Sequence, residues 1–235
     1  MSQPTILDGD ADILLLCDHA SNVVPEGITL GIAPDLLDLH IAVDIGAEPL
    51  TRALAERLDA PAILATVSRL VIDLHREPDH PALIPTASDG HAIPGNRAAD
   101  RDERIDRFHR PYHEALARLI DARAPRLLAS IHSFTPQLEQ GGAPRHWEAG
   151  ILYNADDRAA RVAIDLLRAR RLEIGDNEPY SGKLLNATLN RHGEARGLPY
   201  LAIEVRNDLI SDAAGVWRWT QILSEIIAET RNRVA

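Results

Sequence analysis

Short apolar runs alternate along this chain with longer segments that show helical periodicity. The runs Ile13–Cys17, Arg126–Ile131 and Pro199–Val205 are typical of buried strands. Apolar residues recur with helical spacing in the segments Ala47–Leu58, Asp100–Arg123, Asp156–Arg170 and Gly215–Arg233. This alternation predicts a single α/β domain over residues 1–235, with a central mixed, largely parallel β-sheet and helices on both faces.

Further elements are expected between these segments. Ala62–Val67 and Leu70–Leu74 read as two strands close enough to form a hairpin or a bent pair, and Gly150–Tyr153 as another strand. The long segments 75–97 and 177–186 are predicted to be loops. Pro111 is expected to kink the helix over Asp100–Arg123.

Composition excludes several classes of function. The 25 basic and 35 acidic residues give a net charge of −10, which argues against a nucleic-acid partner, and aromatic residues make up only 4%. The single cysteine, Cys17, excludes an internal disulfide and a cysteine-based zinc cluster. The apolar run at Ile13–Cys17 is far shorter than the roughly 18 residues of a membrane span. A cytoplasmic protein without a membrane partner is therefore expected.

Polar residues end or interrupt three of the predicted strands. His19 follows the first, His132 follows the run Arg126–Ile131, and Glu204 lies within the last. In open α/β sheets, functional groups gather at the carboxyl ends of the strands, so these three side chains can converge. Two imidazoles and a carboxylate suit an open catalytic zinc site, with the glutamate as general base. The alternative is that each histidine merely bonds a backbone carbonyl.

Two charged residues have structural alternatives. Glu204 is costly to bury without a partner, and Arg206 on the same strand face could form a salt bridge with it. In the functional alternative, Glu204 is a general base and Arg206 faces the same cleft. Arg76, where a predicted strand enters the long loop, could bind a substrate carboxylate or be one of many surface arginines.

Ordered segments along the whole chain resemble the N-formylglutamate amidohydrolase family, which is similar in fold and site to zinc carboxypeptidases and aspartoacylase-like deacylases. The resemblance lies in the segments CDHASN (17–22), VDIGA (43–47), SRLVIDLHR (68–76), IPGN (93–96), RPYH (110–113), SIHSFTP (130–136), NEPYSG (177–182) and IEVRNDL (203–209).

The resemblance implies roles for individual residues. His19 and His132 correspond to the two histidine ligands of a zinc ion, one per chain, or of another divalent metal. Glu204 takes the place of the glutamate that activates water. Zinc carboxypeptidases have a third ligand, a glutamate, where this chain has Asn22, so Asp44 is the preferred third ligand. A helix N-cap is the alternative for Asp44.

The resemblance also implies a substrate. Arg76 ends a segment similar to the Asp-Leu-Asn-Arg segment that binds substrate carboxylate, although His75 replaces its asparagine. The substrate's carboxylates are expected to bind Arg76 or Arg206, with help from Asn96, Tyr180 or Ser181. The expected activity is hydrolysis of the amide of a small anionic N-formyl or other N-acyl amino acid, by a monomer or small homo-oligomer.

Three alternatives remain open at this point. The first is an enzyme for a different N-acyl amino acid or a short peptide. The second is a metal-free module that binds a small carboxylate or a partner protein without catalysis, which the asparagine at position 22 would suit. The third is a scaffold in which the buried histidine and glutamate side chains have only structural roles.

Overall fold

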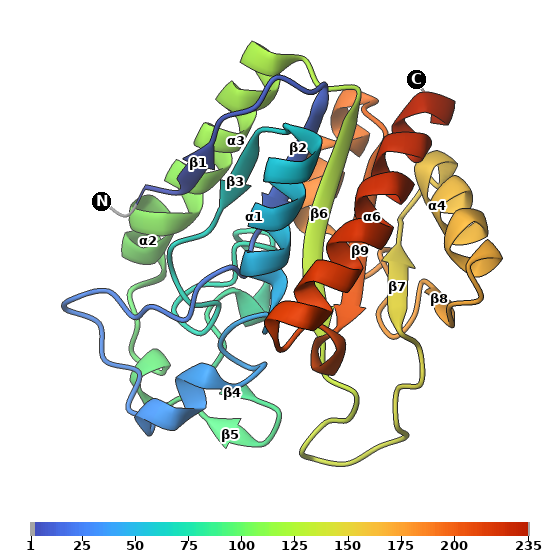
Figure 1. Cartoon of the computed structure of the whole chain (residues 1–235). Coiled ribbons are helices and arrows are strands. Elements are labelled where there is room, and N and C mark those ends of the chain that lie inside the picture. The colour runs from blue at the N-terminus through green and yellow to red at the C-terminus, as the bar shows by residue number, and fades with distance from the viewer. Residues whose placement is uncertain (1–2, 235) are drawn as a thin grey trace.

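A seven-stranded sheet forms the centre of the protein in the computed structural model, which describes residues 3–234 (Figure 1). Across the sheet, the strands are β1 (Thr5–Leu7), β3 (Ala62–Leu64), β2 (Ile13–Cys17), β6 (Leu127–Phe134), β9 (Tyr200–Arg206), β7 (Ala149–Leu152) and β8 (Ile174–Asp176). The four strands β3, β2, β6 and β9 run parallel, and so do β7 and β8. Antiparallel pairs join β1 to β3 and β7 to β9. The sheet is therefore mixed and largely parallel, as predicted.

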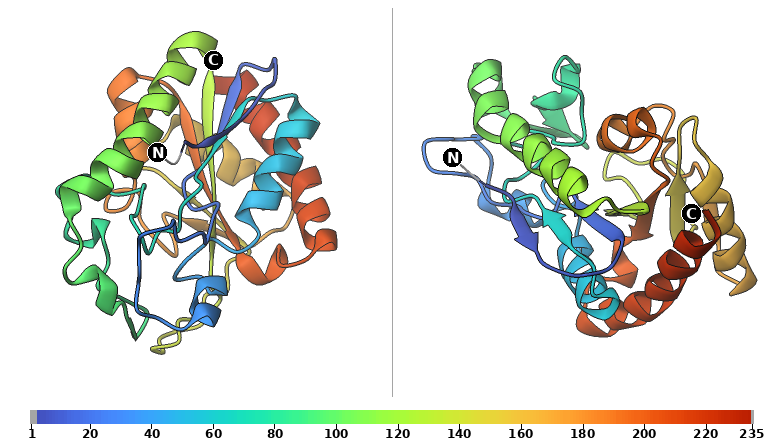
Figure 2. Two further views of the ribbon diagram at one scale, coloured as in Figure 1. Left: turned by 90° about the vertical axis from the view of Figure 1, so that its left-hand side faces the viewer. Right: turned by 90° about the horizontal axis from the view of Figure 1, so that it is seen from above.

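Helices cover both faces of this sheet. One face packs against α1 (Ala47–Leu58), α4 (Arg158–Ala169) and α6 (Ala213–Val234). The other packs against α3 (Arg110–Arg123) and α5 (Ala187–His192), and the view from above in Figure 2 shows α3 opposite α1 and α6. Neighbouring strand residues point to opposite faces, so Leu15 contributes to the first core and Leu14 to the second. This arrangement confirms the predicted α/β class.

The predicted strand over Leu70–Leu74 is wrong. The segment is buried, as its apolar residues require, but its backbone is irregular. Its carbonyl groups accept hydrogen bonds from side chains instead of from a neighbouring strand: Leu70 from Asn96, Val71 from Arg104 and Leu74 from His113. A buried carbonyl group needs a hydrogen-bond donor, which can be a side chain as well as a backbone amide. These polar side chains therefore take the place of a neighbouring strand. The other half of the predicted pair, Ala62–Val67, shortens to β3.

The predicted helix over Asp100–Arg123 consists of α2 (Arg101–Arg104), a π-helical turn (Ile105–His109) and α3. The amide of Arg110 bonds to the carbonyl of Ile105, five residues back. The wide turn lies just before Pro111, which has no N–H to donate and needs space for its ring.

Other boundaries shift or were not anticipated. Strand β6 continues through His132 and Ser133, which were expected to follow it. The short elements β1, β8 and α5 were not predicted, and the loop 75–97 contains a small hairpin of β4 (Ala87–Ser88) and β5 (His91–Ala92). No helix within residues 3–234 combines the length and the apolar character that a membrane crossing needs.

Candidate active site

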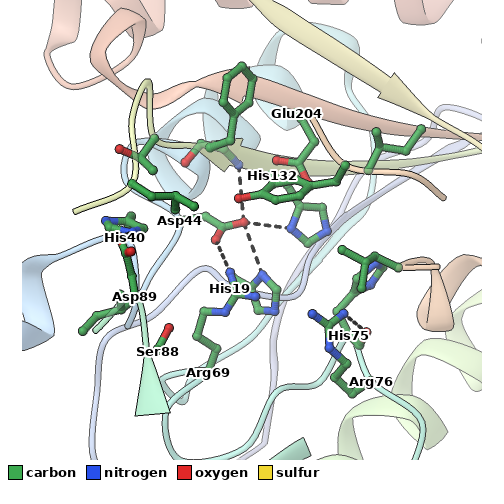
Figure 3. Close-up of a pocket in the computed structure, with 18 of the residues that line it drawn as sticks. His19, His40, Asp44, Arg69, His75, Arg76, Ser88, Asp89, His132 and Glu204 are labelled. Atoms are coloured by element: carbon green, nitrogen blue, oxygen red, sulfur yellow. Dashed lines mark hydrogen bonds and ion pairs between the residues drawn. The ribbon is translucent and has the colours of Figure 1, made fainter. Parts of the chain in front are cut away.

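Three of the sequence-predicted side chains meet at the carboxyl ends of the parallel strands. His132 in β6 and Glu204 in β9 are paired in register, and their alternation directs both to the face opposite α1 and α6. His19 follows β2, the next strand across. All three line a cavity of about 380 Å³, shown in Figure 3. That volume suits a small-molecule ligand.

Asp44 joins the two histidines. Its backbone is held by bonds from its amide to the carbonyl of His19 and from Ala47 to its own carbonyl. Oδ2 of Asp44 lies 2.8 Å from Nδ1 of His132 and 3.3 Å from Nδ1 of His19. The N-cap of α1 is Gly46, at a φ of 81° that favours glycine, so the Asp44 side chain does not cap this helix.

A second carboxylate and an arginine complete the support of His19. Nε2 of His19 lies 2.7 Å from Oδ1 of Asp73, and Arg69 donates to both Asp44 (3.0 Å) and Asp73 (3.1 Å). Burial and the charge of Arg69 lower the pKa of His19, but the two carboxylates outweigh them and raise it to about 9. Burial disfavours ionisation of Asp73, yet His19 and Arg69 hold its pKa well below the usual range. The network therefore fixes the orientation of the His19 ring.

Among residues 3–234, two groups of side chains have donor atoms close enough to hold one metal ion. They are His19, Asp44 and His132, and Asp18, His75 and His132, each with atoms within 4.8 Å of one another. Asp18 is fully buried, and its two oxygens bind Tyr112 and His75. The first group lines the cavity with all three members. Two imidazoles and one carboxylate that face open space fit a divalent metal with a free coordination position.

Glu204 is the least compensated charged group in the cavity. It is buried, and its Oε2 has no hydrogen-bond partner within residues 3–234. Burial, followed by the negative charge of Asp44, raises its pKa to about 8, against the opposing charges of Arg69 and His19. The expected alternative, a salt bridge to Arg206, does not form, because Arg206 pairs with Asp208 at 2.7 Å. A carboxylate that lines a cavity without a hydrogen-bond partner of its own suits a general base.

The structure separates the residues expected to bind substrate. Arg76 and Tyr180 line the cavity, and Nε of Arg76 has no hydrogen-bond partner within the described chain, although it lies 3.9 Å from Oδ2 of Asp73. Asn96, Ser181 and Arg206 are not among the described residues that line it. Asn96 instead supports the buried loop through the carbonyls of Leu70 and Pro85.

Sequence reasoning missed Arg69 and Asp73, although both lie in the SRLVIDLHR segment. Two charges four residues apart around an apolar run were the available signal. It also missed Arg145, which donates to the hydroxyl of Tyr180. Arg145 lies in the segment between β6 and β7, where the sequence shows no pattern that points to the cavity.

Comparisons with known proteins agree with this architecture. The model of the N-formylglutamate amidohydrolase family matches residues 11–211. The structure of a gene product from Agrobacterium tumefaciens is 31% identical, with a TM-score of 0.91 over 98% of this chain and 95% of that chain. An N-formylglutamate amidohydrolase from Ralstonia eutropha shares the fold, with 20% identity and a TM-score of 0.67 over 100% of this chain and 98% of that chain. No functionally curated protein matches. The family match, which spans most of the sequence, shows that this chain belongs to the N-formylglutamate amidohydrolase family.

Proposed function

We propose that this protein is a metal-dependent hydrolase that cleaves the amide bond of an N-formyl or other N-acyl amino acid, such as N-formylglutamate. Family membership supports activity on amides. The observation that carries the proposal is the buried, unpartnered carboxylate of Glu204 beside His132, in a cavity of small-molecule size.

The metal would be held by His19, Asp44 and His132, with zinc as the expected ion. A divalent ion in such a site supplies Lewis acidity toward carbonyl and water oxygens. Asp73 would orient His19 through the 2.7 Å contact at Nε2, which leaves Nδ1 3.3 Å from Oδ2 of Asp44. The protein thus presents one defined ring nitrogen of His19 to the ion.

Glu204 would move the protons of the reaction. It takes a proton from the attacking water as the oxygen bonds to the acyl carbon. It then passes that proton to the amide nitrogen as the carbon–nitrogen bond breaks, which releases the acyl group as a carboxylic acid and the free amino acid. Without a bound metal, the pKa of this carboxyl group is raised to about 8, so both its protonated and its ionised forms are accessible near neutral pH.

Arg76 would bind the carboxylate of the substrate. Its guanidinium donates to the carbonyl of His75 through one terminal nitrogen, while Nε makes no hydrogen bond within residues 3–234 and has only a 3.9 Å ion pair with Asp73. In Figure 3, Glu204 lies near the top of the cavity beside His132, and Arg76 lies at the lower right beside His75. An amino acid bound at Arg76 can therefore direct its acylated nitrogen towards Glu204. This local positive charge lets an anion enter a protein with a net charge of −10.

Elemental analysis and turnover test the proposal together. We expect about one zinc per chain, lost in His19→Ala and in His132→Ala, and retained in the control His146→Ala at an exposed histidine. We expect hydrolysis of N-formyl-L-glutamate, and a loss of about 10²–10⁴-fold in kcat for Glu204→Gln with the metal retained. Absence of metal even after zinc is supplied, or unchanged turnover in Glu204→Gln, would contradict the mechanism. A set of N-acyl amino acids then identifies the preferred acyl group.

A further inference from the structure

An arginine and a tyrosine from separate loops form a pair at the cavity. Arg145 lies in the segment between β6 and β7, and Tyr180 lies between β8 and α5. Nη1 of Arg145 donates to the hydroxyl of Tyr180 at 3.0 Å, and its guanidinium carbon lies 4.8 Å from the centre of the Tyr180 ring. The backbone amide of Arg145 also binds the carbonyl of Pro136 at 2.8 Å, so the loop itself positions the guanidinium.

This pairing leaves the proton of the Tyr180 hydroxyl available. A phenol has one O–H donor and can also accept hydrogen bonds. Arg145 has only donors, so it must occupy an acceptor position of the phenol oxygen. Within residues 3–234, the hydroxyl has no other hydrogen-bond partner. Tyr180 also lines the cavity that contains His132 and Glu204. The hydroxyl is therefore a donor without an acceptor in the cavity that contains the proposed reacting groups.

The electrostatic surroundings keep this donor protonated. Burial and the nearby Glu204 raise the pKa of Tyr180, while Arg145 and Arg69 act in the opposite direction. Tyr180 and the proposed general base, Glu204, line the same cavity. The cation proposed for the substrate carboxylate is Arg76, whose Nε makes no hydrogen bond within residues 3–234. With Arg76 assigned to the carboxylate, the phenol is available to the acyl group of the substrate.

We propose that the Tyr180 hydroxyl donates a hydrogen bond to the carbonyl oxygen of the scissile amide as that oxygen gains negative charge, and that Arg145 is a positioning residue that orients this hydroxyl. The proposal rests on the amide hydrolysis proposed above. A donor fixed in advance stabilises the transition state more than the ground state, because the oxygen becomes anionic only as the bond to water forms. The positive charge of Arg145 also makes the phenol a stronger donor.

A double-mutant cycle on the metal-loaded enzyme tests this assignment. We expect Tyr180→Phe to lower kcat about 10²–10³-fold with little change in KM. Arg145→Ala is expected to lower kcat less, and to add no further loss when combined with Tyr180→Phe, because Arg145 acts through the hydroxyl. Added guanidinium ion should restore part of the activity of Arg145→Ala and none of that of the double variant.

A second arginine–tyrosine pair provides the matched control. Arg161 stacks on Tyr153 with its guanidinium carbon 4.6 Å from the ring centre, but neither residue lines the cavity. Arg161→Ala and Tyr153→Phe should leave kcat unchanged, and thermal unfolding checks that all variants fold.

Three results would overturn the assignment. Additive losses in the double variant would show that Arg145 does not act through Tyr180. A rise in KM alone for Tyr180→Phe would place the hydroxyl on the substrate carboxylate. A metal-loaded wild-type protein that hydrolyses no N-acyl amino acid would refute the proposed function and this role with it, whereas the first two results leave the proposed function intact.

Discussion

Replacing Glu204 by glutamine should stabilise the protein at high pH although it slows catalysis. The carboxyl group has a pKa of about 8 in the folded protein, against an ordinary value of 4.5. The folded state therefore binds this proton more tightly than the unfolded chain, and the wild type loses stability as the pH rises from about 4.5 to 8. At about 1.4 kcal/mol for each pKa unit, this shift corresponds to an upper bound of about 5 kcal/mol. Glutamine carries no charge at any pH, so the variant avoids this loss.

Urea unfolding at pH 5 and pH 9, in the presence of a chelator, measures the difference between Glu204→Gln and the wild type. We expect a small difference at pH 5 and a variant that is more stable by about 2–5 kcal/mol at pH 9. The chelator is required because a bound cation would stabilise the ionised carboxylate. Glu56→Gln, at an exposed position of α1, is the control and should show no pH-dependent difference. A Glu204→Gln variant with the same advantage at both pH values would refute the reasoning.

Three further outcomes are expected. Asp73→Asn should weaken zinc binding about 10–100-fold in a chelator competition, because the histidine hydrogen-bonded to it loses its anionic partner, and unchanged affinity would contradict this role. Burial lowers the pKa of His192 to about 4, below its ordinary 6.5, so it folds in the neutral form. Stability should therefore fall as the pH drops from 6.5 to 4. The melting temperature should depend less on pH in His192→Gln than in the wild type, and the same pH dependence in both proteins would contradict this effect. Asp89 accepts hydrogen bonds from the backbone amides of Glu139 (2.8 Å) and Gln140 (3.2 Å). Asp89→Ala should therefore speed amide hydrogen exchange in segment 136–145 but not in α6. Unaltered exchange would show that these bonds do not order the loop.

Local periodicity was sufficient for the elements with one clear pattern. Ala47–Leu58 forms α1 with the predicted bounds, because its apolar stripe matches the helical repeat. Ile13–Cys17 forms β2, because a central strand of the sheet buries all five of its apolar side chains. At Leu70–Leu74 the apolar pattern correctly predicted burial but wrongly predicted a strand. The donors that satisfy this segment, such as Arg104 and His113, lie more than 30 residues away in sequence.

The sequence by itself determined which chemistry was available. His19 and His132 follow apolar strands, Glu204 lies within one, Arg76 enters a long loop, and Asp44 was identified through a family resemblance. Only the tertiary structure decided how these groups are combined. It directs Asp44 to both histidines and leaves Glu204 without the expected partner. It also brings Arg69 to Asp44 and Asp73, and Arg145 to Tyr180. Periodicity describes neighbours along one chain segment, whereas a hydrogen bond or charge pair depends on distances between segments that only the packed sheet and its loops define.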